Sequence, residues 1–517
     1  TARFTLSRTA STGRTTVASA TLMADVERGH TLPPALLRME TSSLALSDKS
    51  TLRLREILGG RYFWLLLFYS ISLIAVTGAI AAKRHLWWDE IEVYYVATLP
   101  NLQTIWRTLL SGVDWQPPTY YAPVYYLCKW FGASALVLRS IAIFPYWLAT
   151  LVLYVTVARR STPVHGFIAM LFPSLTLAFS YAFEARPYAL MLFFSACAFL
   201  AWELTHEAGT RRIALVGLTL SLGAAFAVHY NACLVALPLV AGEAIRFARR
   251  RKLDIPVLLA IGCSAWPAIF LLPHILTLRH FAGTPSSLSL LGRLSLAYHT
   301  LFSHPILIFS GLGAALAIWF AMPRRETDND RIAAADFDPV TLAASAVFLI
   351  IPVAFCAISY ISRTYYPRYV LETVSGAAIF LAFLLHGAQR AAPRLAGVVL
   401  VIFLIAVVYL AGHRLRTPDE SDWGTFAMYS DLFNRNNKAL SGSTDPVLLG
   451  QGPYLMTLRY GGEDLRRRAF HLLSDAAIKA DPVAGYDRMF YRGLERALPA
   501  PSHLSDYDKF TRQHRRF

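Results

Sequence analysis

Charged residues are scarce in this sequence of 517 residues. Asp, Glu, Lys and Arg together make up only 16% of it, whereas hydrophobic residues make up 55% and the mean hydropathy is +0.42. Soluble globular domains usually carry about 25% charged residues. The composition therefore excludes an ordinary soluble protein and predicts a polytopic α-helical membrane protein.

Cysteine is rare as well, and its placement excludes two further classes of protein. All five cysteines lie in apolar segments, and no Cys-x-x-Cys pair occurs. The histidines between residues 274 and 304 have irregular spacing and form no His-Glu-x-x-His sequence. Neither a disulfide framework nor a recognisable metal motif is indicated.

The charge that is present is mainly positive, with 49 Lys and Arg against 33 Asp and Glu and a net charge of +16. These cations are spread over short loops and the two ends of the chain rather than gathered on one segment. This distribution favours contact with anionic lipid headgroups and disfavours nucleic acid as a partner.

Long apolar runs are abundant. A membrane-spanning helix needs about 20 apolar residues, and the sequence contains eleven candidates. They lie at about 62–82, 137–157, 163–183, 187–204, 213–230, 231–247, 254–273, 305–321, 340–361, 369–387 and 395–411. The segment 120–132 is apolar but too short, which favours an interfacial or re-entrant helix.

The positive-inside bias orients these spans. With a cytoplasmic N-terminus, the Arg and Lys clusters near residues 53–61, 159–160, 211–212, 246–252, 324–325 and 390–394 all fall on the cytoplasmic side. The loop 83–136, the turns at Glu184 and at 363–368, the region 274–304 and the tail after 411 are then exported. We expect a multi-pass protein of the cytoplasmic (inner) cell membrane of a bacterium or archaeon.

Three domains are expected. Residues 1–55 are rich in Ser, Thr and Arg and have no acidic residue before Asp25, which predicts a disordered cytoplasmic tail. Residues 56–411 form the transmembrane domain. Residues 412–517 are charged and rich in turns, with strands expected at 447–450 and 470–473 and helices at 453–460 and 486–498, the pattern of a small exported α/β domain.

The loop 83–136 is long for a connection and carries most of the polar motifs. Residues 102–110 have the apolar spacing of a helix that lies on a surface, and Asp114-Trp115-Gln116-Pro117-Pro118 ends it. Before them stands Trp87-Trp88-Asp89-Glu90-Ile91-Glu92. An acid in front of a helical run can cap that helix, so capping is an alternative to a catalytic role for Asp89.

Other ionisable side chains are expected on the same side of the membrane. Glu184, Arg186 and Tyr188 stand between two spans, and Arg368 with Tyr369 begins a late one. Ionisable groups at such positions are functional or paired with each other, although helix-end snorkelling is an alternative for each arginine. His229 lies at a further turn, where a structural hydrogen bond and a substrate contact are both open.

These motifs, in this order, resemble the C-type glycosyltransferases, most closely the protein O-mannosyltransferase and aminoarabinose-transferase branch. The resemblance rests on Trp88-Asp89-Glu90 after the first span, Pro117-Pro118-x-Tyr120-Tyr121, Glu184-x-Arg186-x-Tyr188 and Arg368-Tyr369, and it covers about residues 60–411. It implies a C-type bundle of about 11 transmembrane helices. The chain lacks the large exported insertion of the eukaryotic protein mannosyltransferases.

The resemblance also implies a reaction. A hexose or pentose carried on a polyprenyl phosphate would move, with inversion, to a hydroxyl of a glycan, lipid or protein. Asp89 would act as the general base, and Glu90 would orient Asp89 or the acceptor. Arg186 and Arg368 would bind the phosphate, and Glu184 would bind sugar hydroxyls or position Arg186. Tyr188, Tyr369 and His229 would line the substrate site.

No cofactor is required by this scheme, although the resemblance allows a divalent metal that bridges Asp89 and Glu184. Two other classes of function stay open. A transporter or flippase of lipid-linked sugars would also place polar residues among apolar spans, but such proteins commonly show internal repeats or polar sites at mid-span, and neither is seen here. A non-catalytic scaffold of the cell envelope would tolerate Asp89→Asn.

Overall fold

The computed structural model describes residues 59–278, 288–302, 339–362, 365–391, 393–416, 444–473 and 503–514, together with residues 434–435, 438, 491, 493–494 and 498. The predicted N-terminal tail at 1–55 and the predicted span at 305–321 lie outside the described residues, as does most of the predicted helix at 486–498.

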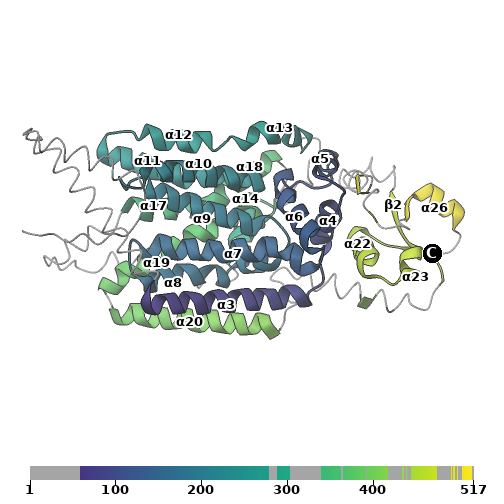
Figure 1. Cartoon of the computed structure of the whole chain (residues 1–517), viewed down its shortest axis with the longest axis horizontal. Helices are drawn as coiled ribbons and strands as arrows, with labels where there is room; N and C mark the ends of the chain where they lie inside the picture. Colours follow the sequence, from purple (N-terminus) through teal and green to yellow (C-terminus); the bar gives the residue numbers. More distant parts are fainter. Residues whose placement is uncertain are drawn as a thin grey trace, which may run out of the picture. The chain divides into compact units, whose positions relative to one another are not determined.

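The described part of the chain is a bundle of long apolar helices (Figure 1). Five stretches of it are long and apolar enough to cross a membrane, or seven if each of two bent helix pairs counts as one span. The five are α3 (Gly60–Lys83), α7 (Ala135–Ala158), α10 (Arg211–Val228), η3 with α11 (Tyr230–Val235, Ala236–Arg250) and α17 to α18 (Pro339–Val347, Ile351–Ser362). The chain is therefore a polytopic helical membrane protein, and the number of eleven spans stays a prediction.

The two bent pairs fall where single spans were predicted. Helices α8 (Pro163–Leu171) and η1 (Phe172–Leu175) meet η2 (Leu177–Phe183) at 78°, and α12 (Ile255–Cys263) meets α13 (Pro267–Leu278) at 43°. Three further predicted spans contain the helices α9 (Tyr188–Leu204), α19 (Thr373–Ala391) and α20 (Pro393–Arg416). Their apolar segments, Tyr188–Leu204, Thr373–Gln389 and Gly397–Leu410, are shorter than those of the five. Helix α9 packs against both α7 and α10 and is almost entirely buried.

The loop between the first two spans folds into three helices that gather at one end of the long helices (Figure 1). They are α4 (Trp88–Ala97), α5 (Leu102–Leu110) and α6 (Pro118–Phe131). The Asn101 side chain caps α5 by accepting a hydrogen bond from Thr104 N–H at 2.8 Å. Pro118 begins α6, where a missing N–H costs nothing, and Gly132 ends it at φ 81°.

The capping alternative for Asp89 is wrong. Trp87 is the N-cap of α4, and Asp89 is the second residue of the helix. The acid that contacts the cap is Glu90, whose Oε2 accepts a hydrogen bond from Trp87 N–H at 3.3 Å. The Asp89 side chain therefore does not cap the helix.

The described part of the tail contains a small parallel sheet in the order β1 (Val447–Leu448), β2 (Ala469–Leu473), β3 (His503–Asp506). Helices α22 (Gln451–Tyr460) and α23 (Glu463–Arg468) connect β1 to β2, and α26 (Tyr507–Gln513) follows β3. Strands β1 and β2 and helix α22 coincide with the elements predicted from the sequence. The domain boundary at 412 and the export of the tail stay predictions.

Helix α22 packs against α4. The Tyr460 hydroxyl accepts a hydrogen bond from Leu86 N–H at 2.8 Å, and the Arg459 guanidinium lies 4.5 Å from the centroid of the Tyr94 ring. Leu86 and Tyr94 flank Asp89 in the sequence, so the tail supports the helix that carries Asp89.

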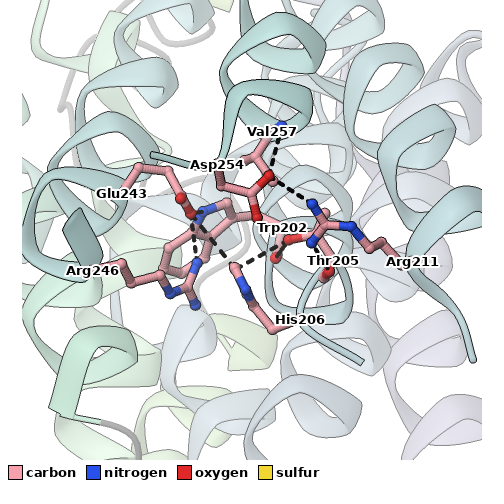
Figure 2. Close-up of polar contacts among 8 residues, drawn as sticks. All are labelled: Trp202, Thr205, His206, Arg211, Glu243, Arg246, Asp254 and Val257. Carbon is pink, nitrogen blue, oxygen red and sulfur yellow. Dashed lines mark hydrogen bonds and ion pairs between the residues drawn. The ribbon is translucent and has the colours of Figure 1, made fainter. Parts of the chain in front are cut away.

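A compact polar cluster lies at the C-terminal end of α9, and we call it the helix-end cluster (Figure 2). It consists of Trp202, Thr205, His206, Arg211, Glu243, Arg246, Asp254 and Val257. Glu243 Oε1 accepts hydrogen bonds from Trp202 Nε1 at 2.7 Å and from Arg246 Nη1 at 2.6 Å. Arg211 Nη2 donates to Asp254 Oδ1 at 2.6 Å. These pairs join α9, α10, α11 and α12 where the helices end.

Candidate active site

The motif residues meet at the end of the bundle where α4 to α6 lie, and a buried ion pair anchors them. Glu90 and Arg139 of α7 are each 1% exposed and lie 2.6 Å apart, from Glu90 Oε2 to Arg139 Nη2. The same guanidinium donates to the carbonyls of Ala81, Arg84 and His85. Every nitrogen of this guanidinium therefore has an acceptor, as a buried charge requires.

Glu90 also reaches the second motif. Its Oε1 accepts a hydrogen bond from Ala185 N–H at 2.8 Å. This contact fixes the turn between η2 and α9, which carries Glu184 and Arg186, against the start of α4. Glu90 thus holds two loops together, and the Arg139 guanidinium rather than Asp89 is its side-chain partner.

Asp89 lies between two arginines. Its Oδ2 is 3.3 Å from Arg368 Nη2 and 3.6 Å from Arg186 Nη2. Arg186 also donates to the Asp89 carbonyl at 3.4 Å. The side chains of Asp89 and Arg186 are 7% and 5% exposed, and that of Arg368 is 14% exposed. Arg368 comes from η5 (Pro367–Val370), so three separate segments meet at one carboxylate.

A second carboxylate, Asp114, completes this network and was not among the predicted site residues. Its Oδ2 lies 3.2 Å from Arg186 Nη1 and accepts a hydrogen bond from the Tyr121 hydroxyl, and its Oδ1 accepts from Gln116 N–H at 3.2 Å. Asp114 is buried. The sequence signal was an acid three residues before the Pro-Pro break, which indicated only the end of a helix.

Glu184 is buried beside this network but does not pair with Arg186 through its side chain. Its Oε1 has no hydrogen-bond partner. Burial, followed by the nearby Glu90 carboxylate, raises the pKa of Glu184 to about 8, although Arg368 opposes that shift. Glu184 is therefore largely protonated at neutral pH and able to donate a hydrogen bond.

Aromatic rings form one wall of the site. The Tyr188 and Tyr369 rings stack at 6.4 Å, and the His229 ring lies 5.5 Å and 5.1 Å from them respectively. The Arg368 guanidinium lies 4.9 Å from the Tyr366 ring and 5.9 Å from the Tyr188 ring. Tyr188, Tyr369 and His229 are thus brought together with Arg368, as a common substrate site requires.

Several buried polar atoms of this site have no hydrogen-bond partner among the described residues. They are Asp89 Oδ2, Glu184 Oε1, the Nε atoms of Arg186 and Arg368, the hydroxyls of Tyr120 and Tyr188, and His229 Nδ1. Buried polar atoms normally are hydrogen-bonded. Seven such atoms on one network of residues indicate a place for a polar, partly anionic ligand.

Glu92 is a fifth acid in this region, one helical turn after Asp89 on α4. It is 5% exposed. Burial, then the carboxylates of Asp89 and Asp114, raise the pKa of Glu92 well above its usual value, and Arg186 and Arg368 oppose the shift. The sequence motif includes Glu92, but its side chain was not predicted to enter the site.

A metal centre finds no support in the described residues, where no group of three or more His, Cys, Asp or Glu side chains could hold a metal ion. The Asp89 carboxylate is engaged by two guanidinium groups, which leaves a bridge to Glu184 without a third ligand.

Comparisons with known proteins give a likeness of fold. No family model and no curated protein matches the sequence. Among solved structures, ArnT from Cupriavidus metallidurans in the apo state matches with a TM-score of 0.53 and 14% identity, over 87% of this chain and 90% of that one. ArnT bound to undecaprenyl phosphate matches with a TM-score of 0.51 and 14% identity, over 88% and 91%. This likeness confirms the predicted polytopic helical fold, whereas the count of about 11 transmembrane helices and the exported C-terminal domain stay predictions.

Proposed function

We propose that this protein is a membrane glycosyltransferase that moves a sugar from a polyprenyl phosphate to an acceptor hydroxyl. One observation carries the proposal: two buried guanidinium groups meet at one carboxylate, and each keeps an Nε without an acceptor. A guanidinium binds phosphate oxygens through parallel N–H groups. The undecaprenyl phosphate in one of the similar ArnT structures supports the same class of donor.

In the proposed reaction, the acceptor oxygen forms a bond with the anomeric carbon on the face opposite the phosphate. The bond between that carbon and the phosphate oxygen breaks, and the lipid leaves as a phosphate monoester. The proton of the acceptor hydroxyl passes to Asp89, which acts as the general base. Arg186 and Arg368 stabilise the additional negative charge on the departing phosphate.

The positions of Asp89, Arg186 and Arg368 without substrate suggest an order of events, in which the donor binds before Asp89 acts as the base. Asp89 shares its Oδ2 between Arg186 and Arg368, at distances that are ion pairs without a hydrogen bond. A bound phosphate competes for the same guanidinium groups, so donor binding loosens their hold on Asp89 and leaves its carboxylate free for the acceptor hydroxyl.

The remaining site residues have binding roles in this proposal. Protonated Glu184 donates to a sugar oxygen, and the Tyr188, Tyr369 and His229 rings supply an apolar wall with polar edges. Glu90 acts through the turn that it fixes and does not touch the reacting atoms. The site faces the outside of the cell membrane, where the positive-inside bias places α4 to α6. The sugar is a hexose or pentose, and the acceptor is a glycan, a lipid or a protein.

Substitution of Asp89 tests the mechanism. Asp89→Asn keeps the size of the side chain but cannot take up a proton, so transfer should fall about 10²- to 10⁴-fold. Binding of undecaprenyl phosphate should persist, because the variant removes the competing charge from both arginines. Transfer is measured with the purified protein, a radiolabelled polyprenyl-phosphate sugar and an envelope extract as acceptor.

The exposed acid Glu463, whose side chain is 69% exposed, supplies the matched control. Glu463→Gln should transfer at the wild-type rate. A folded Asp89→Asn protein that transfers as fast as this control would remove Asp89 from the mechanism. Wild type that binds the lipid phosphate but transfers no sugar would instead favour a transporter of lipid-linked sugars, and wild type that does neither would favour a scaffold.

A further inference from the structure

The two arginines at Asp89 have no positive charge left over for a further acid. Arg186 pairs with Asp89 and Asp114, and Arg368 pairs with Asp89. These two carboxylates already balance the two guanidinium groups. A donor phosphate diester adds one negative charge, and Glu92 would add another if it were ionised.

Glu92 differs from Asp89 and Asp114 in its partners. Among the residues that the structure describes, no cation lies within 4.0 Å of its carboxylate and no hydrogen bond reaches its side chain. It nevertheless stands three residues after Asp89 on α4, where the Cβ atoms of neighbours one turn apart are about 5–6 Å from each other. Its side chain is buried.

We propose that Glu92 carries a proton when the anionic lipid phosphate occupies the site, so that donor binding is linked to the protonation of this one carboxyl group. The inference rests on the proposed function, because it assumes a phosphate at Arg186 and Arg368. Protonated Glu92 removes one negative charge from the neighbourhood of the phosphate and supplies an O–H that can donate to it.

The charged and titratable groups around Glu92 are consistent with this link. Asp89 on its own helix, Asp114 and Tyr121 near the start of α6, and the two arginines all interact with it electrostatically. The two aspartates disfavour its ionised form, and a phosphate would do so further. On the side of α22, Arg459 lies over the Tyr94 ring.

Glu184 is the competing proton carrier, because it too is buried and its pKa is about 8. The Glu90 carboxylate disfavours its charged form, and Arg368 and Arg84 attract that form. The two acids can be told apart by substitution, since Gln resembles a protonated Glu and does not titrate.

The test measures binding of the methyl ester of undecaprenyl phosphate, a phosphodiester whose charge does not change near neutral pH. Wild-type Kd should rise by up to about tenfold per pH unit once the pH passes the pKa of Glu92 in the free protein. Glu92→Gln should lose this dependence and bind more tightly than wild type at the alkaline end. Glu184→Gln and the exposed control Glu463→Gln should keep it.

The outcomes separate the two proposals. A pH dependence that persists in Glu92→Gln, or that vanishes only in Glu184→Gln, would overturn the role of Glu92 and leave the phosphate site intact. Wild type that fails to bind the ester at every pH would overturn the proposed donor itself. If Glu92→Gln does not fold, titration calorimetry of wild type in two buffers of different ionisation enthalpy measures how many protons the protein takes up when the ester binds. About one proton should be taken up at the alkaline end, and none would contradict the proposal.

Discussion

Helix α9 connects two charged regions that contain the same residue types but serve different purposes. At its start, the arginines of the candidate site hold carboxylates at 3.2–3.6 Å and keep Nε atoms without acceptors. At its other end, about 25 Å away for a helix of this length, three of the contacts in the helix-end cluster are hydrogen bonds of 2.6–2.7 Å (Figure 2). The longer contacts there join Val257 N–H to Asp254 at 3.4 Å and His206 to Glu243 at 3.6 Å.

The difference teaches how to recognise a binding site among buried charges. No buried side-chain nitrogen or oxygen of the eight residues in the helix-end cluster lacks a hydrogen-bond partner. The Arg246 guanidinium even lies 4.0 Å from the Trp202 ring, which covers its face. A satisfied cluster fastens helices together, whereas the longer and incomplete pairs of the candidate site leave capacity for a ligand.

The pair Glu90–Arg139 sharpens the comparison. Its guanidinium nitrogens all have acceptors, although it lies within a site where other buried polar atoms have no hydrogen-bond partner. Arg139→Met should lower the free energy of unfolding by about 3–5 kcal/mol, since the Glu90 charge would stay buried without its partner. Thermal unfolding of the detergent-solubilised protein, followed by tryptophan fluorescence, measures this loss.

The exposed pair Arg467–Glu463 is the control for that measurement. Its side chains are 64% and 69% exposed, so Arg467→Met should change stability by less than about 1 kcal/mol. Equal melting temperatures for Arg139→Met and Arg467→Met would mean that the buried pair does not anchor the site.

Much of this site could be predicted from the sequence, because its order of motifs carries the information. Asp89, Arg186, Tyr188, Arg368 and Tyr369 were expected on one side of the membrane and meet within one network. Apolar length likewise placed the long helices. Both predictions depend on patterns that are local in the sequence.

What could not be predicted depends on partners far apart in the chain. Arg139 lies within an apolar run and 49 residues from Glu90, so nothing local indicated that it would neutralise that acid. Asp114 reaches Arg186 across 72 residues. The 78° bend between Leu175 and Leu177 could not be predicted from hydropathy either, because hydropathy records how apolar a segment is and not the direction in which it runs.

The two site arginines should show the second largest effect. Arg186→Ala and Arg368→Ala each remove charge-assisted contacts to the phosphate, worth about 1.5–3 kcal/mol, or roughly 10- to 150-fold in donor affinity. Arg186→Ala should cost more, because it also leaves Asp114 without its cation. The Kd of each variant for undecaprenyl phosphate, the lipid part of the donor, tests the expectation. Wild-type Kd in both would leave these arginines as structural groups and would make the two ends of α9 alike.

The smallest effect on function is expected in the helix-end cluster, where the change should concern stability alone. Glu243→Gln keeps an oxygen that can accept from Trp202 but loses the ion pair with the buried Arg246, which should cost about 1.5–3 kcal/mol of unfolding free energy. Donor affinity and the transfer rate should equal those of wild type, because the cluster is satisfied within itself. A variant with normal stability but slower transfer would show that this end of α9 takes part in the reaction, and the contrast between a closed cluster and an open site would fail.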